Sequence, residues 1–184
     1  VSIDRAFAAI GFLSAGNIAH EFSQQAVINA IPNIRDTAQN NQANAIFFTA
    51  NTAGALPLFS QLLPAAGVDP TKTQYIGLAR WDTPPQTLEL PGVQGGWFAL
   101  PDPRRNAQFQ TRYQAAYGNT PHALAGLAYD GIAAVGALVS SGKSDALTTG
   151  SLTQPAGFQG VNGVFRFLPD GTKARALAVA TIEN

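Results

Sequence analysis

Short apolar runs alternate with longer segments of helical spacing along the first half of the chain. The runs at residues 44–49, 73–78 and 95–100 are short and mainly apolar, as expected of strands covered on both faces of a parallel sheet. In the segments at residues 23–41 and 50–67, apolar side chains recur every three or four positions, which is the spacing of an amphipathic helix. This alternation predicts an α/β fold in which helices flank a parallel sheet.

A further strand-like pattern precedes these elements. In the sequence NIAHEF at residues 17–22, Ile18, His20 and Phe22 alternate with more polar or smaller residues. Because successive side chains of a strand point to opposite faces, this period of two predicts a strand directly before the first long helix.

The second half of the chain contains clear helix and turn signals. Asp102 followed by Pro103 is typical of a helix start, with the carboxylate as the cap and proline at the first helical position. Residues 121–142 predict a second helix that is apolar over most of its surface. Residues 163–182 predict two strands joined at the sequence PDG, residues 169–171, where glycine supplies positive φ. The fold class is therefore a parallel α/β sheet with a C-terminal antiparallel hairpin.

Composition excludes several function classes. Eleven basic residues balance eleven acidic ones, and charged residues make up only 12% of the chain, so no basic footprint for nucleic acid is present. The chain contains no cysteine, which removes disulfides, thiol catalysis and thiolate metal sites. Nucleic acid is therefore not an expected partner.

The residues that could perform catalysis are few. The two histidines are His20 and His122, and His20 is followed by Glu21, which on a strand would point to the opposite face. His122 follows a proline at an expected helix start, where a capping or solvated role is favoured. The sequence contains neither a nucleophile elbow nor a phosphate-binding loop. We expect no catalytic residues, no metal site, no cofactor and no enzymatic activity.

Two loops after predicted parallel strands are the candidate binding elements. The first contains Asn51 and Thr52, and the second contains Trp81 and Asp82. In open α/β sheets, ligands bind beyond the carboxyl ends of the strands, where these hydroxyl, amide, indole and carboxylate groups would lie. A purely structural interpretation stays open: Thr52 caps a helix, Asp82 caps a turn, and Trp81 packs against its loop. If the loops bind a ligand, Trp81 faces it, while Trp97 packs within a strand.

Four segments in this order resemble the type I solute-binding proteins of the periplasm. They are ANAIFFTANTAGALPLFSQLLPAAGVDPTKTQYIGLARWDTP, GGWFALPDP, FQTRYQAAYGNTPHALAGLAYDGIAAVGAL and GFQGVNGVFRFLPDGTKARALAV. The resemblance is to leucine/isoleucine/valine-binding-like receptors of ABC importers, and also to penicillin-binding protein activators. It implies a fragment: most of the C-terminal lobe at residues 1–99, a crossover and N-terminal-lobe helices at 100–157, and a return crossover with the terminal hairpin at 158–184.

The resemblance also implies a function and a site. It implies a periplasmic component of an ABC-type importer that binds an amino acid or similar small polar ligand between two lobes, with transporter membrane subunits as partners. The implied ligand residues are Asn51, Thr52, Arg80, Trp81 and Asp82. The alternative is a ligand-independent interaction domain of the envelope, whose partner is a cell-wall synthase.

Overall fold

The computed structural model describes residues 7–8, 11–78, 80–122, 124–142 and 144–183. The chain forms two compact units, each with its own sheet. Unit 1 comprises Val1–Ala99 and Val179–Asn184, and unit 2 comprises Leu100–Ala178. The chain therefore re-enters unit 1 after Ala178.

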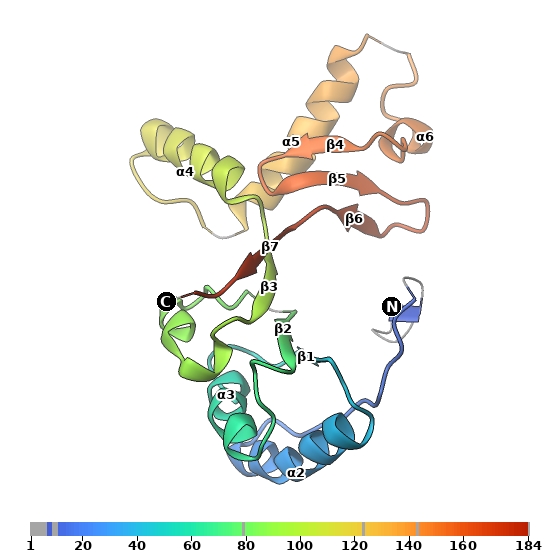
Figure 1. The fold of residues 1–184 in the computed structure, drawn as a ribbon. Helices are drawn as coiled ribbons and strands as arrows, with labels where there is room; N and C mark the ends of the chain where they lie inside the picture. The colour runs from blue at the N-terminus through green and yellow to red at the C-terminus, as the bar shows by residue number, and fades with distance from the viewer. Residues whose placement is uncertain (1–6, 9–10, 79, 123, 143, 184) are drawn as a thin grey trace. The chain divides into compact units, whose positions relative to one another are not determined.

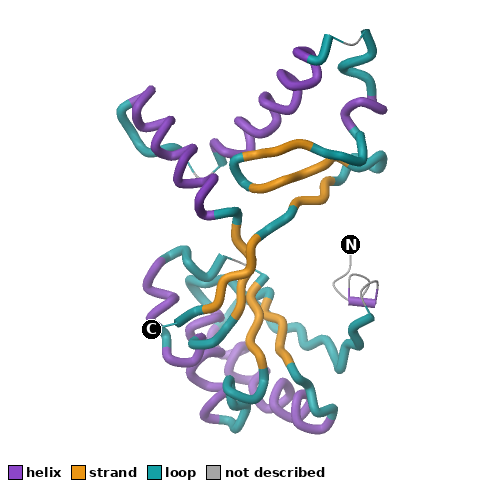
Figure 2. The backbone as a smooth tube through the Cα atoms, turned by 45° about the horizontal axis from the view of Figure 1, so that its top comes forward, coloured by secondary structure: helices purple, strands orange, loops and turns teal. Residues whose placement is uncertain are grey.

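Unit 1 contains a four-stranded sheet with the order β1-β2-β3-β7 (Figures 1 and 2). The strands are β1 (Ala45–Phe48), β2 (Gln74–Gly77), β3 (Trp97–Leu100) and β7 (Ala178–Thr181). β1 pairs in parallel with β2, and β2 pairs in parallel with β3. The predicted parallel sheet is therefore confirmed. The sequence pattern did not predict that β7 would join this sheet. Next to the two strands, Gly95 N–H donates a hydrogen bond to the carbonyl of Ile182 at 2.8 Å.

Two long helices and two short 3₁₀ helices also belong to the described part of unit 1. These are α2 (Gln24–Asn40), α3 (Ala55–Ala65), η1 (Pro85–Glu89) and η2 (Pro91–Val93). α2 starts at its cap Ser23, whose hydroxyl accepts a hydrogen bond from Ala26 N–H at 3.1 Å. It buries Val27, Ile31 and Ala38, as the apolar spacing predicts. α2 and α3 pack against each other (Figure 1).

Residues 17–22 do not form the predicted strand. They have no regular secondary structure, and the chain becomes helical only at Gln24. Ile18 and His20 are nonetheless half-buried, whereas Ala19 and Glu21 are exposed. The alternation thus survives as a pattern of burial, without the backbone pairing that a strand requires.

Aromatic side chains fill the core of unit 1. Phe48 lies at the centre, with ring centroids 5.1 Å from Tyr75, 5.7 Å from Phe59 and 6.2 Å from Trp81. Trp81 also stacks on Phe98 at 6.4 Å. These contacts join β1, α3, β2, β3 and the loop after β2 into one packed cluster.

Raising the pH through the titration of Tyr75 is expected to destabilise unit 1. Burial raises the pKa of this phenol, and the nearby Asp69 raises it further, while the hydroxyl donates to the carbonyl of Val68 at 2.9 Å. The unfolded phenol ionises near pH 10, so the stabilisation is complete below about pH 10 and is lost as the pH rises above it. Urea unfolding across this range should show a steeper loss of stability for the wild type than for Tyr75→Phe. Identical slopes would contradict this prediction.

The described residues of unit 2 form a three-stranded antiparallel sheet and three helices. The sheet order is β4-β5-β6, with β4 (Phe158–Gly160), β5 (Gly163–Phe167) and β6 (Lys173–Arg175). The helices are α4 (Pro103–Tyr117), α5 (Ala125–Ser140) and α6 (Thr149–Leu152). α5 packs on the sheet through Ala134 and Leu138, which join Phe158 and Phe165 in the core of this unit.

The predicted local signals of unit 2 are confirmed. The Asp102 carboxylate accepts from Arg104 N–H at 2.9 Å, and Pro103 is the first residue of α4. β5 and β6 form the predicted antiparallel hairpin, and Gly171 in its turn has φ of 81°. The hairpin is shorter than the sequence suggested, because its second strand ends at Arg175 and the chain continues into β7.

Candidate functional site

Two loops of unit 1 follow the carboxyl ends of neighbouring parallel strands. Residues 49–54 follow β1, and residues 78–84 follow β2. Because β1 and β2 run in the same direction, both loops emerge at the same edge of the sheet. This edge is where open α/β sheets bind ligands.

A hydrogen bond joins the two loops directly. The hydroxyl of Thr52 donates to the backbone carbonyl of Thr83 at 2.7 Å, across 31 residues of sequence. The sequence had assigned Thr52 as the cap of the following helix, and that assignment is wrong. α3 begins at Ala55 with Gly54 in the cap position, and no side chain caps it.

Asn51 shapes the first loop. Its side-chain oxygen accepts a hydrogen bond from Gly54 N–H at 2.8 Å, and its backbone carbonyl accepts from Leu56 N–H at 3.2 Å. Both bonds hold the chain in the bend that leads into α3. Among the described residues no partner accepts from the side-chain NH₂ of Asn51, so its two donors are available to a ligand.

Arg80 and Asp82 form an ion pair in the second loop. The guanidinium Nε of Arg80 donates to one carboxylate oxygen of Asp82 at 2.7 Å, and Nη2 contacts the other oxygen. Hydrogen bonding to Asp82 raises the pKa of Arg80, so the guanidinium stays charged. The pair is partly exposed, with 46% of the Arg80 side chain and 23% of the Asp82 side chain accessible. A ligand at this edge would therefore meet a neutralised pair with spare guanidinium donors.

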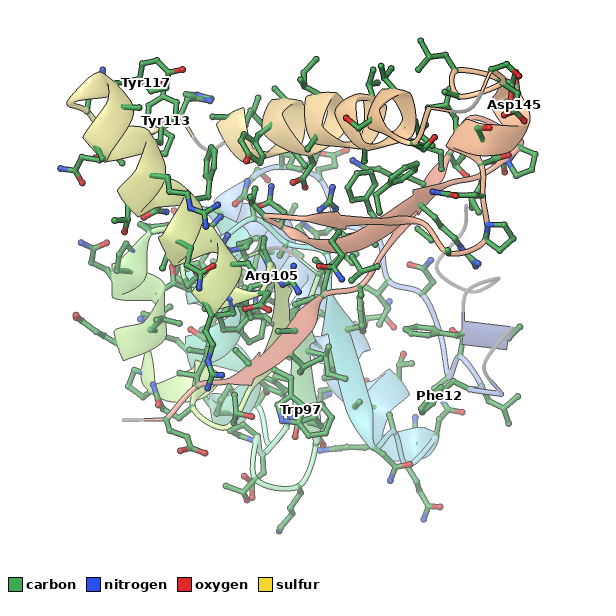
Figure 3. All side chains as sticks on the ribbon, turned by 90° about the horizontal axis from the view of Figure 1, so that it is seen from above. Phe12, Trp97, Arg105, Tyr113, Tyr117 and Asp145 are labelled. Carbon is green, nitrogen blue, oxygen red and sulfur yellow. The ribbon has the colours of Figure 1, made fainter. Side chains whose placement is uncertain are left out.

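The burial of the two tryptophans is the reverse of the prediction. Trp81 has 0% exposure and belongs to the aromatic core, whereas Trp97 is 43% exposed. Figure 3 labels Trp97. Two glycines make room for the Trp81 indole: a Cβ on Gly96 would lie 2.7 Å from Cζ3, and one on Gly77 would overlap the ring. Sequence reasoning missed this because Gly96 is separated from Trp81 by an irregular stretch containing η1 and η2.

The Trp81 indole N–H has no hydrogen-bond partner among the described residues. Its ring packs between Phe48 and Phe98, both of which are apolar. Trp81 therefore anchors its loop in the core of unit 1, while the side chains of Arg80 and Asp82 remain partly exposed.

A groove of about 1470 Å³ lies along β1 in unit 1. The residues of the β1 loop that line it include Thr49 and Asn51, whereas Thr52, Arg80, Trp81 and Asp82 do not line it. His20 and Glu21 line the same groove. Neither was proposed as a binding residue from the sequence. Both lie shortly before Ser23, the cap of α2.

Nothing in the described ranges of the chain has the form of a metal site or a membrane span. No group of three or more histidine and acidic side chains is placed to hold a metal ion there. None of the helices described is long and apolar enough to cross a bilayer.

Comparison with known families identifies the fold. A family model described as periplasmic binding protein matches residues 2–184. The chain belongs to this family. The resemblance seen in the sequence is thereby confirmed.

A solved structure supports the same fold. It is the solute-binding protein of an ABC transporter from R. palustris, in complex with benzoate. The TM-score is 0.51 at 15% sequence identity, and the match covers 98% of this periplasmic binding protein chain but 50% of the other protein. At this identity the likeness shows the fold alone, and the chain spans half the length of that relative. Comparison with curated proteins finds no match.

Proposed function

We propose that this chain is part of the periplasmic solute-binding component of an ABC-type importer. Its ligand is an amino acid or a similar small polar molecule, and its partners are the membrane subunits of the transporter. The observation that carries the proposal is the Thr52–Thr83 hydrogen bond, which fastens two strand-end loops together at the edge where this fold class binds ligands. The family membership supports the same role.

The five implied residues take different parts in this proposal. Asn51 offers its amide donors, and Arg80 offers the guanidinium donors that Asp82 leaves unoccupied. Asp82 orients Arg80, and it can hold a ligand ammonium group only by exchanging one of its bonds to Arg80. Thr52 fastens the loops, and Trp81 supports them from the core. This arrangement favours recognition of a ligand carboxylate by unit 1.

Calorimetric titration of the intact protein with the twenty amino acids and with benzoate tests the proposal. We expect saturable binding of at least one of these compounds, weakened about 10- to 100-fold by Arg80→Gln, since a hydrogen bond to a charged group is worth about 1.5–3 kcal/mol. Asn51→Ala should weaken it less. The matched control is Asp69→Asn, which changes an acidic residue that precedes β2 and is therefore remote from the ligand edge.

Two outcomes would contradict the proposal. One is the absence of binding heat with every compound while circular dichroism shows a folded protein. The other is equal loss of affinity in Arg80→Gln and Asp69→Asn, since only Arg80 lies in a strand-end loop.

A second function is favoured by the surface of α5. This helix carries large apolar side chains away from the sheet of unit 2, with exposures of 40–76% for Leu127, Ile132, Val135 and Val139. Such a surface suits the alternative role of an envelope interaction domain that binds a cell-wall synthase without a small ligand. Co-purification with a synthase that Ile132→Glu abolishes, together with no ligand binding, would favour this role.

A further inference from the structure

Trp81 is the point at which the loop after β2 enters the core of unit 1. Among the described residues 78 and 80–86, Trp81 alone is buried. Its two neighbours in the chain, Arg80 and Asp82, are partly exposed and form the ion pair at the ligand edge. Because consecutive Cα atoms are about 3.8 Å apart, the position of Trp81 restricts where the backbone of both charged residues can lie.

The Trp81 indole fills the space between two segments of the sheet. A Cβ on Gly77 of β2 would overlap Cε2 and Nε1 of the ring, and a Cβ on Gly96, directly before β3, would lie 2.7 Å from Cζ3. Nε1 and Cζ3 lie at opposite ends of the bicyclic ring. The full length of the indole is therefore used to reach from Gly77 to Gly96.

Backbone conformation does not explain the glycine at either position. Neither Gly77 nor Gly96 has a φ in the left-handed region that favours glycine, whereas the adjacent Gly95 has a φ of 75°. A glycine inside a strand weakens the strand, and it often marks a close approach of another group. The three atoms nearest to a Gly77 Cβ all belong to the Trp81 indole, whereas at Gly96 the carbonyl of Val93 is equally near. Gly77 thus makes room for the indole alone.

Filling of the core does not by itself explain why residue 81 is tryptophan. The buried indole N–H has no hydrogen-bond partner among the described residues, and an unpaired buried donor lowers stability. A phenylalanine would pack beside Phe48 and Phe98 without that donor. A single phenyl ring, however, is too short to reach from Gly77 to Gly96. Residues that break a local stability rule in this way are expected at functional sites.

The Arg80–Asp82 ion pair lies across the backbone of Trp81. Arg80 Nε donates to an Asp82 carboxylate oxygen at 2.7 Å, so the residues on either side of the tryptophan are joined. The loop is also held near its two ends. Leu78 N–H donates to a carbonyl of β1 at 2.9 Å, and the carbonyl of Thr83 accepts from the β1 loop at 2.7 Å. Between these two bonds, Trp81 is the described residue that fixes the loop to the core.

We propose that Trp81 is a positioning residue for ligand binding and that Gly77 leaves the space that fixes its position. The length of the indole, from β2 to the residue before β3, sets where the Arg80–Asp82 pair stands at the ligand edge. Trp81 and Gly77 act on the ligand through Arg80. The inference rests on the proposed function, because that function assigns the ligand contact to Arg80.

NMR of the isotope-labelled intact protein without ligand tests the positioning. The Nε–H signal of Arg80 is identified by its absence from Arg80→Gln. In Trp81→Phe and in Gly77→Ala this signal should shift, and its hydrogen should exchange faster with solvent, because the bond from Nε to Asp82 is displaced. The matched control is Gly136→Ala in α5, where nothing in the described ranges lies within 4 Å of the added methyl group. It should leave the signal unchanged.

Two further measurements separate positioning from general damage. In a Trp81→Ala background the indole is gone, so Gly77→Ala should cause no further change in the Arg80 signal. Calorimetry with a compound that binds the wild type should show about 10-fold weaker binding by Trp81→Phe, because the hydrogen bond from Arg80 to the ligand is weakened. The titration is made at a temperature at which circular dichroism shows both proteins folded.

Three outcomes would overturn the proposal. The first is an Arg80 signal that is the same in Trp81→Phe as in the wild type. The second is an effect of Gly77→Ala that persists in the Trp81→Ala background. The third is weaker binding without any change in the Arg80 signal. If no compound binds the wild type, the proposed function fails, whereas the NMR measurement still decides whether the indole positions the ion pair.

Discussion

Replacing Trp81 with alanine should lower the free energy of unfolding by about 3–5 kcal/mol, the usual loss when a large aromatic side chain is removed from a core. The indole has no exposed surface and packs against Phe48 and Phe98, and glycines at 77 and 96 leave the space that it fills. Urea unfolding followed by circular dichroism measures the loss.

The other tryptophan provides the matched control. Trp97 is 43% exposed, so Trp97→Ala should cost much less, within about 1 kcal/mol of the wild type. Trp81→Phe should also cost less than Trp81→Ala, because it keeps an aromatic ring and removes an indole N–H that lacks a partner. A larger loss in Trp97→Ala than in Trp81→Ala would contradict the assigned burial.

Replacing Asp130 with alanine should destabilise the protein by about 3–5 kcal/mol, since it leaves a buried cation without its partner. Asp130 is 1% exposed, and its carboxylate accepts from Arg175 Nη1 at 2.8 Å and from Val161 N–H at 2.6 Å. The guanidinium of Arg175 lies 4.7 Å from the centre of the Phe165 ring, and only 13% of the Arg175 side chain is exposed. The free energy of urea unfolding measures the effect.

Two further variants separate the ion pair from general damage. Asp145→Ala removes an exposed carboxylate of the same unit (Figure 3) and should change stability by less than about 0.5 kcal/mol. Adding Arg175→Met to Asp130→Ala should recover part of the loss, because the buried charge then disappears. A double variant less stable than Asp130→Ala would show that the arginine stabilises the fold without its partner.

Local chemistry explains which parts of the fold could be read from the sequence. The start of α4 depends on Asp102 and Pro103, and the hairpin turn depends on Gly171, so each signal lies within a few residues of the structure it specifies. The parallel strands were recognisable because short apolar runs alternate with helical spacing. The family resemblance rests on the same ordered set of segments, and the family model confirms it.

The candidate site was less accessible to such reasoning. The two loops could be placed at one sheet edge, because parallel strands end on the same side. Their internal contacts could not be derived. The sequence predicted that Thr52 caps the following helix, whereas its hydroxyl donates a hydrogen bond to the backbone carbonyl of Thr83. Asp82 stays a predicted ligand residue, but the sequence did not predict that both of its carboxylate oxygens contact Arg80.

The sequence by itself determined the class of the fold, the helix and turn signals, and the position of two loops at one edge of the parallel sheet. Periodicity, capping and turn formation depend on residues that are close together in the sequence, within one helical turn or one hairpin. They can therefore be predicted from the sequence pattern. Only the tertiary structure decided that Trp81 is buried, that Trp97 is exposed, and that β7 joins the parallel sheet. Each of these depends on side chains far away in the chain, such as Gly96 beneath the indole and Ile182 beside Gly95. Burial is a property of the assembled packing, which local pattern does not encode.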